Sequence, residues 1–201
     1  MVMLLLASNN KGKLIEMQSL LADTSYQLTL LQDIGIRLAV EESGSTYAEN
    51  AALKARSAAL ASGLMALADD SGLEVAALGG KPGLFSARYA QVPGASDADR
   101  RAILLQELAQ HARPWLARFH CVVAIATPAG RLYFSKGECP GEIIPEERGD
   151  NGFGYDPIFL ISSLGRTMAE LSTEEKNQIS HRAMALKNAK PMLTELITGE
   201  R

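Results

Sequence analysis

Two adjacent aspartates, Asp69 and Asp70, come directly after a run of apolar residues at positions 64–68. A run of this length, followed by Ser71 and Gly72, is typical of a buried strand that ends at a turn. Two neighbouring carboxylates at a strand end resist joint ionisation unless a cation lies beside them. The pattern therefore predicts either a plain turn, in which Asp, Ser and Gly are common, or a site for a divalent cation.

The composition of the chain is that of an ordinary globular protein, with 201 residues, 47% hydrophobic and 21% charged. We expect one domain covering residues 1–201. A net charge of -3 argues against a nucleic-acid-binding protein, which needs a basic face, although a local basic cluster could hold a small anion. The apolar start is too short for a signal peptide and no segment reaches membrane-spanning length, so we expect a cytoplasmic protein with no membrane partner.

A polar segment separates the first predicted strand, residues 2–7, from a stretch in which apolar residues recur at helical spacing. The segment consists of Ser8, Asn9, Asn10, Lys11, Gly12 and Lys13. Backbone N–H groups at a helix start, with Ser, Asn and Lys side chains beside them, are suited to binding an anion. The spacing matches neither a Walker loop nor a dinucleotide glycine fingerprint, so an ordinary capped helix is the alternative.

An alanine-rich stretch at residues 48–61 is predicted to be a helix that begins at a capping box of Thr46 and Glu49. Lys54 lies on this helix and Glu41 precedes it. Each of these charged residues, taken alone, is more typical of a solvated surface than of a binding site.

A glycine-rich loop carries two aromatic residues, Phe153 and Tyr155, shortly before an apolar strand at residues 158–161. The glycines let the backbone approach a flat ligand, and the two rings offer a stacking surface. A hairpin-type loop without any ligand is the alternative.

Three basic residues, Lys176, His181 and Arg182, lie close to the start of the last predicted helix. Their side chains could read the edge of a base. Pro191 lies within the same stretch, and a proline there is expected to kink or interrupt the helix, unless Lys190 ends one helix and Pro191 begins another.

Together these features match the requirements of a nucleoside triphosphate site. The acids Glu41, Asp69 and Asp70 can hold a metal, and the polar turn with Lys54 can hold phosphates. Neither the cysteines nor the order of Ser, His and Asp indicates a competing covalent or zinc mechanism.

The sequence resembles the inosine triphosphatase-like nucleoside triphosphate pyrophosphatases, a family that removes deaminated purine nucleotides. The resemblance runs over residues 4–186 and rests on blocks that occur in the same order at residues 8–13, 41–44, 49–54, 68–72, 82–89, 153–156 and 180–182. It implies an α/β fold with a twisted mixed β-sheet flanked by helices, in two lobes with a central cleft, and a homodimer.

The resemblance also implies the reaction, which is the Mg²⁺-dependent hydrolysis of ITP, dITP, XTP or dXTP to the nucleoside monophosphate and pyrophosphate. Carried over by position, the metal ligands are Glu41 and Asp70, and the acids that activate water are Asp70 and Asp69. The substrate-binding residues are Ser8, Asn9, Asn10, Lys11, Gly12, Lys13, Lys54, Ser71, Phe153, Gly154, Tyr155, Asp156, Lys176, His181 and Arg182. His181 and Arg182 would donate to the carbonyl at the purine 6-position.

Two other functions remain open from the sequence. One is a nucleotide-binding regulatory module, and the other is a pyrophosphatase of the same fold with a different base preference. The sequence departs from the family pattern at Ser8, where Thr is common, and at Pro191, where the helix usually has no proline.

Overall fold

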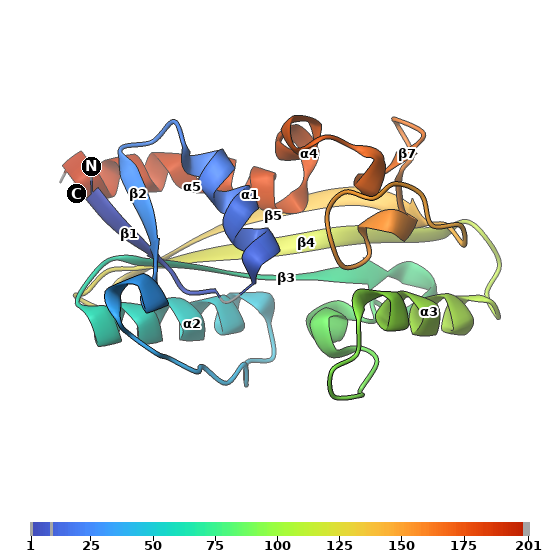
Figure 1. Cartoon of the computed structure of the whole chain (residues 1–201), viewed down its shortest axis with the longest axis horizontal. Coiled ribbons are helices and arrows are strands. Elements are labelled where there is room, and N and C mark those ends of the chain that lie inside the picture. Colours follow the sequence, from blue (N-terminus) through green and yellow to red (C-terminus); the bar gives the residue numbers. More distant parts are fainter. Residues whose placement is uncertain (1, 9, 199–201) are drawn as a thin grey trace. The chain divides into compact units, whose positions relative to one another are not determined.

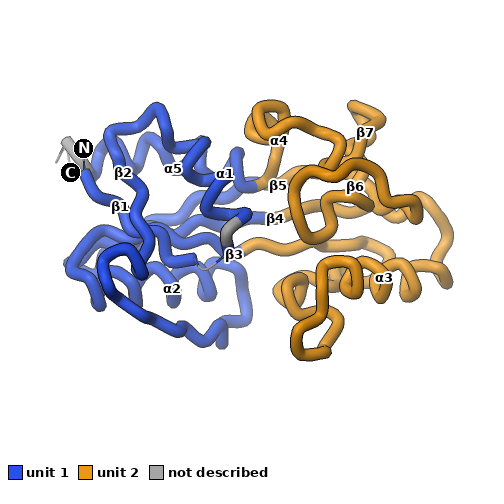
Figure 2. The backbone as a smooth tube through the Cα atoms, viewed as in Figure 1, with its two compact units in different colours: residues 1–70, 121–137, 182–201 blue, residues 71–120, 138–181 orange. Residues whose placement is uncertain are grey.

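The computed structural model describes residues 2–8 and 10–198 (Figure 1), and of Lys11, Ile197 and Thr198 it describes the backbone alone. The chain divides into two compact units (Figure 2). Unit 1 comprises Met1–Asp70, Cys121–Gly137 and Arg182–Arg201, and unit 2 comprises Ser71–His120 and Glu138–His181.

The strands of the described chain form a sheet in the order β2-β1-β3-β4-β5-β6-β7. Strand β1 pairs in parallel with β2 and β3, whereas β6 pairs antiparallel with β5 and β7. The predicted mixed sheet flanked by helices is therefore confirmed. The strands are β1 Val2–Leu6, β2 Tyr26–Leu30, β3 Ala66–Val75, β4 Trp115–Ala126, β5 Leu132–Ile143, β6 Phe159–Ile161 and β7 Arg166–Thr167.

Unit 1 has helices on both faces of its strands: α1 (Lys11–Leu21) and α5 (His181–Thr198) cover one face and α2 (Tyr47–Ser62) the other (Figure 1). Successive residues of a strand point to opposite faces. Accordingly, Leu67 of β3 packs in one core with side chains from α1 and α5. Ala66 and Ala68 pack in a second core with the alanines of α2.

Helix α2 begins and ends where its local sequence predicts. The Thr46 side chain accepts the backbone N–H of Glu49, and Gly63 ends the helix in the left-handed region at φ 70°. The Glu49 carboxylate accepts the backbone N–H of Ser45 at 2.7 Å. The first turn is therefore capped.

Helix α5 runs without interruption through Pro191, so the prediction of a break there is wrong. Proline removes one helical hydrogen bond and crowds the preceding turn, which destabilises a helix. Here Ala189 and Leu193, on either side of Pro191, are both buried in the core of unit 1. The Tyr26 hydroxyl also donates to the Leu193 carbonyl at 2.9 Å. Tertiary packing thus holds the helix together across the proline.

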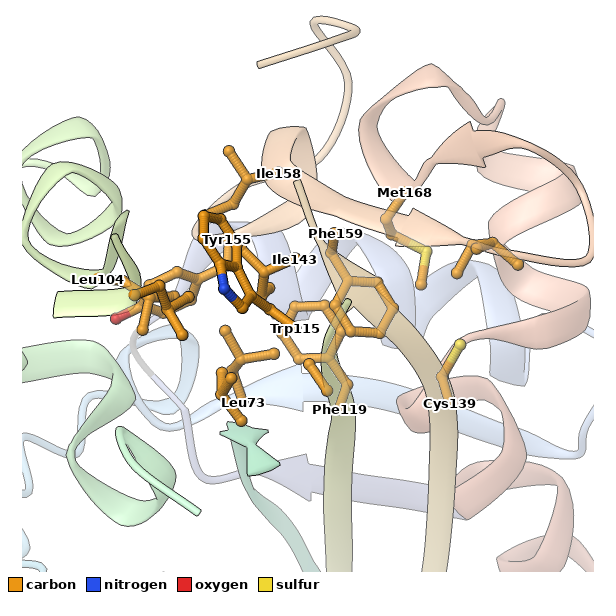
Figure 3. Close-up of a cluster of buried hydrophobic side chains, with 14 of the residues drawn as sticks. Leu73, Leu104, Trp115, Phe119, Cys139, Ile143, Tyr155, Ile158, Phe159 and Met168 are labelled. Atoms are coloured by element: carbon orange, nitrogen blue, oxygen red, sulfur yellow. The ribbon is translucent and has the colours of Figure 1, made fainter. Parts of the chain in front are cut away.

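Unit 2 carries α3 (Asp97–Leu108) and α4 (Thr173–Ile179) around its own apolar core (Figure 3). Leu104 and Leu108 of α3 contact a cluster that includes Trp115 and Phe159. Ser96 caps α3 by accepting the backbone N–H of Asp99. Among the described residues, no helix is long and apolar enough to cross a membrane.

Strand β3 does not end at the aspartates, contrary to the prediction of a strand-end turn. It continues from Ala66 to Val75, so Asp69 and Asp70 lie in its middle. Both residues are buried, with exposed fractions of 2% and 7%. Each carboxylate pairs with at least one cation, which offsets the cost of burying its charge.

Candidate active site

Asp69 is the centre of a buried charge network in unit 1. Lys13 Nζ lies 2.8 Å from Asp69 Oδ2, and Arg182 approaches the same oxygen at 3.2 Å through Nη2. Arg182 also pairs with Glu16 of α1. Burial by itself would raise the pKa of Asp69, but Lys13 and Arg182 outweigh it and hold that pKa well below its usual value. Asp69 is therefore a permanently charged anchor for two cations.

Arg182 is the second member of this network. Its side chain is 1% exposed, and it is paired with Asp69 and Glu16. The two carboxylates raise the pKa of the guanidinium, although burial opposes them. The guanidinium thus donates to two acids of unit 1, and a contact of Arg182 with the edge of a base stays a prediction.

The turn before α1 is a capped helix start. The Ser8 hydroxyl accepts the backbone N–H of Asn10, and Asn10 Oδ1 accepts the backbone N–H of Lys13 at 3.1 Å. Asn9 lies outside the described residues. The Lys13 side chain keeps 16% of its surface exposed. Anion binding at this turn stays a prediction, and Lys13 is the described ammonium group best placed for it.

Asp70 is paired with other residues of unit 1. Lys54 Nζ lies 2.9 Å from Asp70 Oδ1 and 2.8 Å from Glu42 Oε1, so one ammonium group bridges two carboxylates. Asn50 Nδ2 also donates to Asp70 Oδ2. Burial outweighs the attraction of Lys54 and raises the pKa of Asp70 above its usual value. Asp70 thus differs from Asp69 in the direction of its pKa shift, which suits a group that takes up a proton.

The pKa of Lys54 is also shifted. Burial would lower it, but the charges of Asp70, Asp69 and Glu42 together raise it. Lys54 therefore keeps its positive charge, as a residue that binds phosphate must.

A metal site would have to use few protein ligands here. In the described part of the chain, no group of three or more His, Cys, Asp or Glu side chains is placed to hold a metal ion. Glu41 is exposed and Glu42, its neighbour, pairs with Lys54. Mg²⁺ commonly binds through one or two carboxylates, with waters and substrate phosphates completing its shell. The oxygen donors of Asp70 and Glu41 fit that chemistry.

In unit 2 the structure brings together three of the residues predicted to bind the nucleoside. Lys176 Nζ lies 2.7 Å from Asp156 Oδ2, and the same oxygen accepts the backbone N–H of Phe153 at 3.0 Å. Lys176 also lies 5.1 Å from the centre of the Phe153 ring, within cation–π range. Gly152 adopts φ +79°, and a Cβ there would lie 2.1 Å from Asp156 Oδ2. This loop is therefore built tightly around Asp156.

Tyr155 is a core residue, which limits the predicted stacking surface to Phe153. Its ring is 4% exposed within the apolar core of unit 2 (Figure 3), and its hydroxyl donates to the Ser86 carbonyl at 2.9 Å. Gly154, between the two aromatic residues, donates its N–H to Asp97 of α3 at 2.7 Å. Helix α3 thus fixes the loop.

His181 and Ser71 complete the set of predicted residues. His181 is buried and stacks on Phe119, with ring centres 4.7 Å apart and planes inclined by 15°. Ser71 is half-buried in β3. Phe119 therefore fixes the plane of the imidazole ring.

The sequence reasoning missed Glu16, Asn50 and the pairing of Glu42. Helical spacing could have found the first two, because residues three or four apart lie on one helix face. Glu16 is three residues after Lys13, and Asn50 is four residues before Lys54. Glu42 had no such signal, since it lies in a loop before α2.

Comparison with known proteins gives consistent results along the whole chain. The model of the Ham1 family matches residues 4–192. A dITP/XTP pyrophosphatase from Desulforamulus reducens is 47% identical over 96% of this chain and 96% of its own length. A second dITP/XTP pyrophosphatase, from Deinococcus radiodurans, is 46% identical over 90% of this chain and 87% of its own length. The structure of a HAM1 protein from Coxiella burnetii superposes with a TM-score of 0.88 at 47% identity, covering 97% of this chain and 100% of that one.

Proposed function

The chain belongs to the Ham1 family, and on that premise we propose that it hydrolyses deaminated purine nucleoside triphosphates, namely ITP, dITP, XTP and dXTP. The products are the nucleoside monophosphate and pyrophosphate. Relatives that are called dITP/XTP pyrophosphatases match nearly the full length of the chain, which supports this activity. This activity would remove deaminated purine nucleotides from the nucleotide pool.

One observation carries the proposal: β3 places two acid–lysine pairs at consecutive residues. Asp69 holds Lys13, and Asp70 holds Lys54. Two ammonium groups can offset part of the charge of a triphosphate, while a carboxylate with a raised pKa can accept a proton from water. A protein that only binds nucleotide has no need of a carboxylate that accepts a proton from water.

Asp70 acts as the base in the proposed reaction. It takes a proton from water as the water oxygen bonds to the α-phosphorus, and the bond from the α-phosphorus to the oxygen that bridges to the β-phosphate breaks. Pyrophosphate leaves with the electron pair of that bond. Lys13 and Lys54 bind the phosphate oxygens and offset the charge that develops on them.

Glu41 and Asp70 are the residues that we propose to hold Mg²⁺. A bound Mg²⁺ would neutralise phosphate charge and lower the pKa of a coordinated water. The ion pair of Lys54 with Asp70 supports the proposal for Asp70, whose carboxylate accommodates a positive charge.

For the base we propose the loop of Phe153, Asp156 and Lys176 as the binding surface, with His181 as a further contact. The Phe153 ring is half-buried and lies beside a buried lysine–aspartate pair. Arg182, which pairs with Asp69 and Glu16, stays a proposed contact to the base. We also propose a homodimer located in the cytoplasm. Light scattering coupled to size-exclusion chromatography tests the dimer.

A panel of nucleoside triphosphates, assayed with Mg²⁺ and with chelator, tests the function. Pyrophosphate and orthophosphate are measured separately for ITP, dITP, XTP, GTP, ATP and damaged pyrimidine nucleotides. We expect pyrophosphate from ITP, dITP and XTP, and loss of turnover with chelator. Release of orthophosphate would place the cleavage at another bond. Binding without turnover would favour the regulatory module, and a preference for ATP or a pyrimidine would favour the alternative base specificity.

A further inference from the structure

A buried asparagine, Asn50, connects the loop at residues 41–44 to Asp70. Asn50 is 1% exposed, and it lies on the face of α2 that otherwise carries buried alanines. Taking a carboxamide out of water costs free energy unless its donor and acceptor are both bonded. The groups that Asn50 binds therefore explain why a polar residue is retained at this position.

The two hydrogen bonds of Asn50 run in opposite directions from its carboxamide. Oδ1 accepts the backbone N–H of Gly44 at 2.8 Å, and Nδ2 donates to Asp70 Oδ2 at 3.3 Å. A backbone N–H can only donate, so the first bond fixes which end of the carboxamide carries the oxygen. That choice directs the Nδ2 hydrogens toward the carboxylate of Asp70.

The loop packs on Asn50 so closely that Gly44 has no room for a side chain. A Cβ on Gly44 would lie 2.7 Å from Asn50 Oδ1 and 2.7 Å from Glu49 Cβ. Glu42, two residues earlier, shares the Lys54 ammonium with Asp70. The loop and the strand are thus joined twice, once through a neutral carboxamide and once through an ion pair.

We infer that Asn50 is a positioning residue for the proposed hydrolysis, because it holds the Asp70 carboxylate and the loop at residues 41–44 in one fixed arrangement. The inference rests on the proposed function, in which Asp70 is the base. Asn50 acts through Asp70, and a hydrogen-bonded partner of this kind typically contributes ~10–100-fold to activity.

A double-mutant cycle tests whether Asn50 acts through Asp70. The kcat and KM for ITP are measured for wild type, Asn50→Ala, Asp70→Asn and the double variant. We expect Asn50→Ala to lower kcat by ~10–100-fold with little change in KM. In the Asp70→Asn background the same change should have almost no effect, because the group that Asn50 positions is already disabled. An equal fall in kcat on Asn50→Ala in the wild-type and Asp70→Asn backgrounds overturns the inference. A change in KM with kcat unaltered also overturns it.

Two further variants separate positioning from folding. Asn50→Asp keeps an oxygen that can accept the Gly44 N–H, but its other carboxylate oxygen replaces the NH₂ group that donates to Asp70. We expect kcat to fall in this variant. A folded Asn50→Asp protein with wild-type kcat contradicts the inference. Asn188→Ala is the matched control. Asn188 is an exposed asparagine of α5 that donates to the Lys136 carbonyl at 2.9 Å, and its loss should leave kcat unchanged. Thermal unfolding verifies that each variant is folded.

The outcome for Asn50 can be told apart from the outcome for the proposed function. If wild type cleaves a triphosphate other than ITP, the cycle is run on that substrate. Crystal structures of wild type and Asn50→Ala give a readout that needs no activity at all. We expect the Asp70 carboxylate or the loop at residues 41–44 to move when Asn50 is truncated. Unchanged positions of both would overturn the inference.

Discussion

Asp69 and Asp70 are joined by one peptide bond, yet their carboxylates lie on opposite faces of β3 and pair with different cations. Asp69 faces α1 and α5, where it binds Lys13 and Arg182. Asp70 faces α2, where it binds Lys54. Alternation along a strand separates the two acids, so each pairs with a lysine of its own, and their pKa values shift in opposite directions.

Removing the charge of Asp69 should destabilise the protein strongly. Asp69→Asn leaves Arg182 and Lys13 without their shared anion inside unit 1, and loss of one partner from a buried ion pair costs roughly 3–5 kcal/mol. Urea unfolding at pH 7 measures the free energy of unfolding. The control is Asp23→Asn, since Asp23 pairs with Lys190 at the surface and its loss should change stability little. If Asp69→Asn and Asp23→Asn lowered the free energy of unfolding equally, Asp69 would not be a buried anchor for Lys13 and Arg182.

The stability that Asp69 provides should disappear in acid. The pKa of Asp69 is lowered in the folded protein from its usual value of 3.8, so as pH falls the unfolded chain takes up the proton first. The difference in unfolding free energy between wild type and Asp69→Asn should therefore be constant above pH ~5 and shrink as pH falls through 3.8. Urea titrations at several pH values between ~3 and ~7 measure it. If the difference in unfolding free energy between wild type and Asp69→Asn grew as pH fell, the lowered pKa of Asp69 would be contradicted.

Asp70→Asn should abolish most activity and leave the fold intact. Loss of a general base typically costs ~10²–10⁴-fold in rate. The variant keeps the size of the side chain, and thermal unfolding verifies that it folds. Asp69→Asn is assayed alongside at a temperature where it is folded. Because Asp69 holds Lys13, we expect a raised KM more than a lowered kcat. Near-normal turnover in folded Asp70→Asn would remove this residue from the mechanism.

Gly152→Ala should disrupt the nucleoside-binding loop of unit 2. A Cβ at Gly152 would collide with the Asp156 carboxylate that holds Lys176, in addition to the strain of a positive φ. Gly165→Ala is the control, because Gly165 has a similar φ of +63° and open space around it. The strain alone costs ~1–3 kcal/mol in each variant. We expect only Gly152→Ala to weaken ITP binding, measured as KM and by calorimetry with a non-hydrolysable analogue.

The parts of the fold that depend on local chemistry could be predicted from the sequence. Thr46 and Gly63 set the ends of α2, and the apolar run after the start predicts β1. The prediction at Pro191 failed because its local cost is outweighed by burial of Ala189 and Leu193, which depends on segments far away in the chain. Local sequence patterns predict where a helix ends. Whether a proline interrupts a helix depends on the tertiary packing around it.

The site was predictable in its residue types but not in their pairing. Asp69 and Asp70 were expected to share one cation, and the continuation of β3 separates them. Arg182 is 113 residues away from Asp69 in the chain, so no local pattern reveals that the two are bound. Tyr155 resembles a stacking residue in sequence because it lies in a glycine-rich loop, and only the packing of unit 2 shows that its ring is in the core.

The interleaving of the two units along the chain has a practical consequence for the gene. The backbone passes from one unit to the other at four peptide bonds, after Asp70, His120, Gly137 and His181. No contiguous stretch of the gene therefore encodes either unit alone, because any fragment that contains one unit whole also contains residues of the other. Truncation is a poor way to isolate half of this protein. A circular permutant with new ends in the surface turn at residues 127–131, which keeps every strand whole, is the better route to relocating its termini.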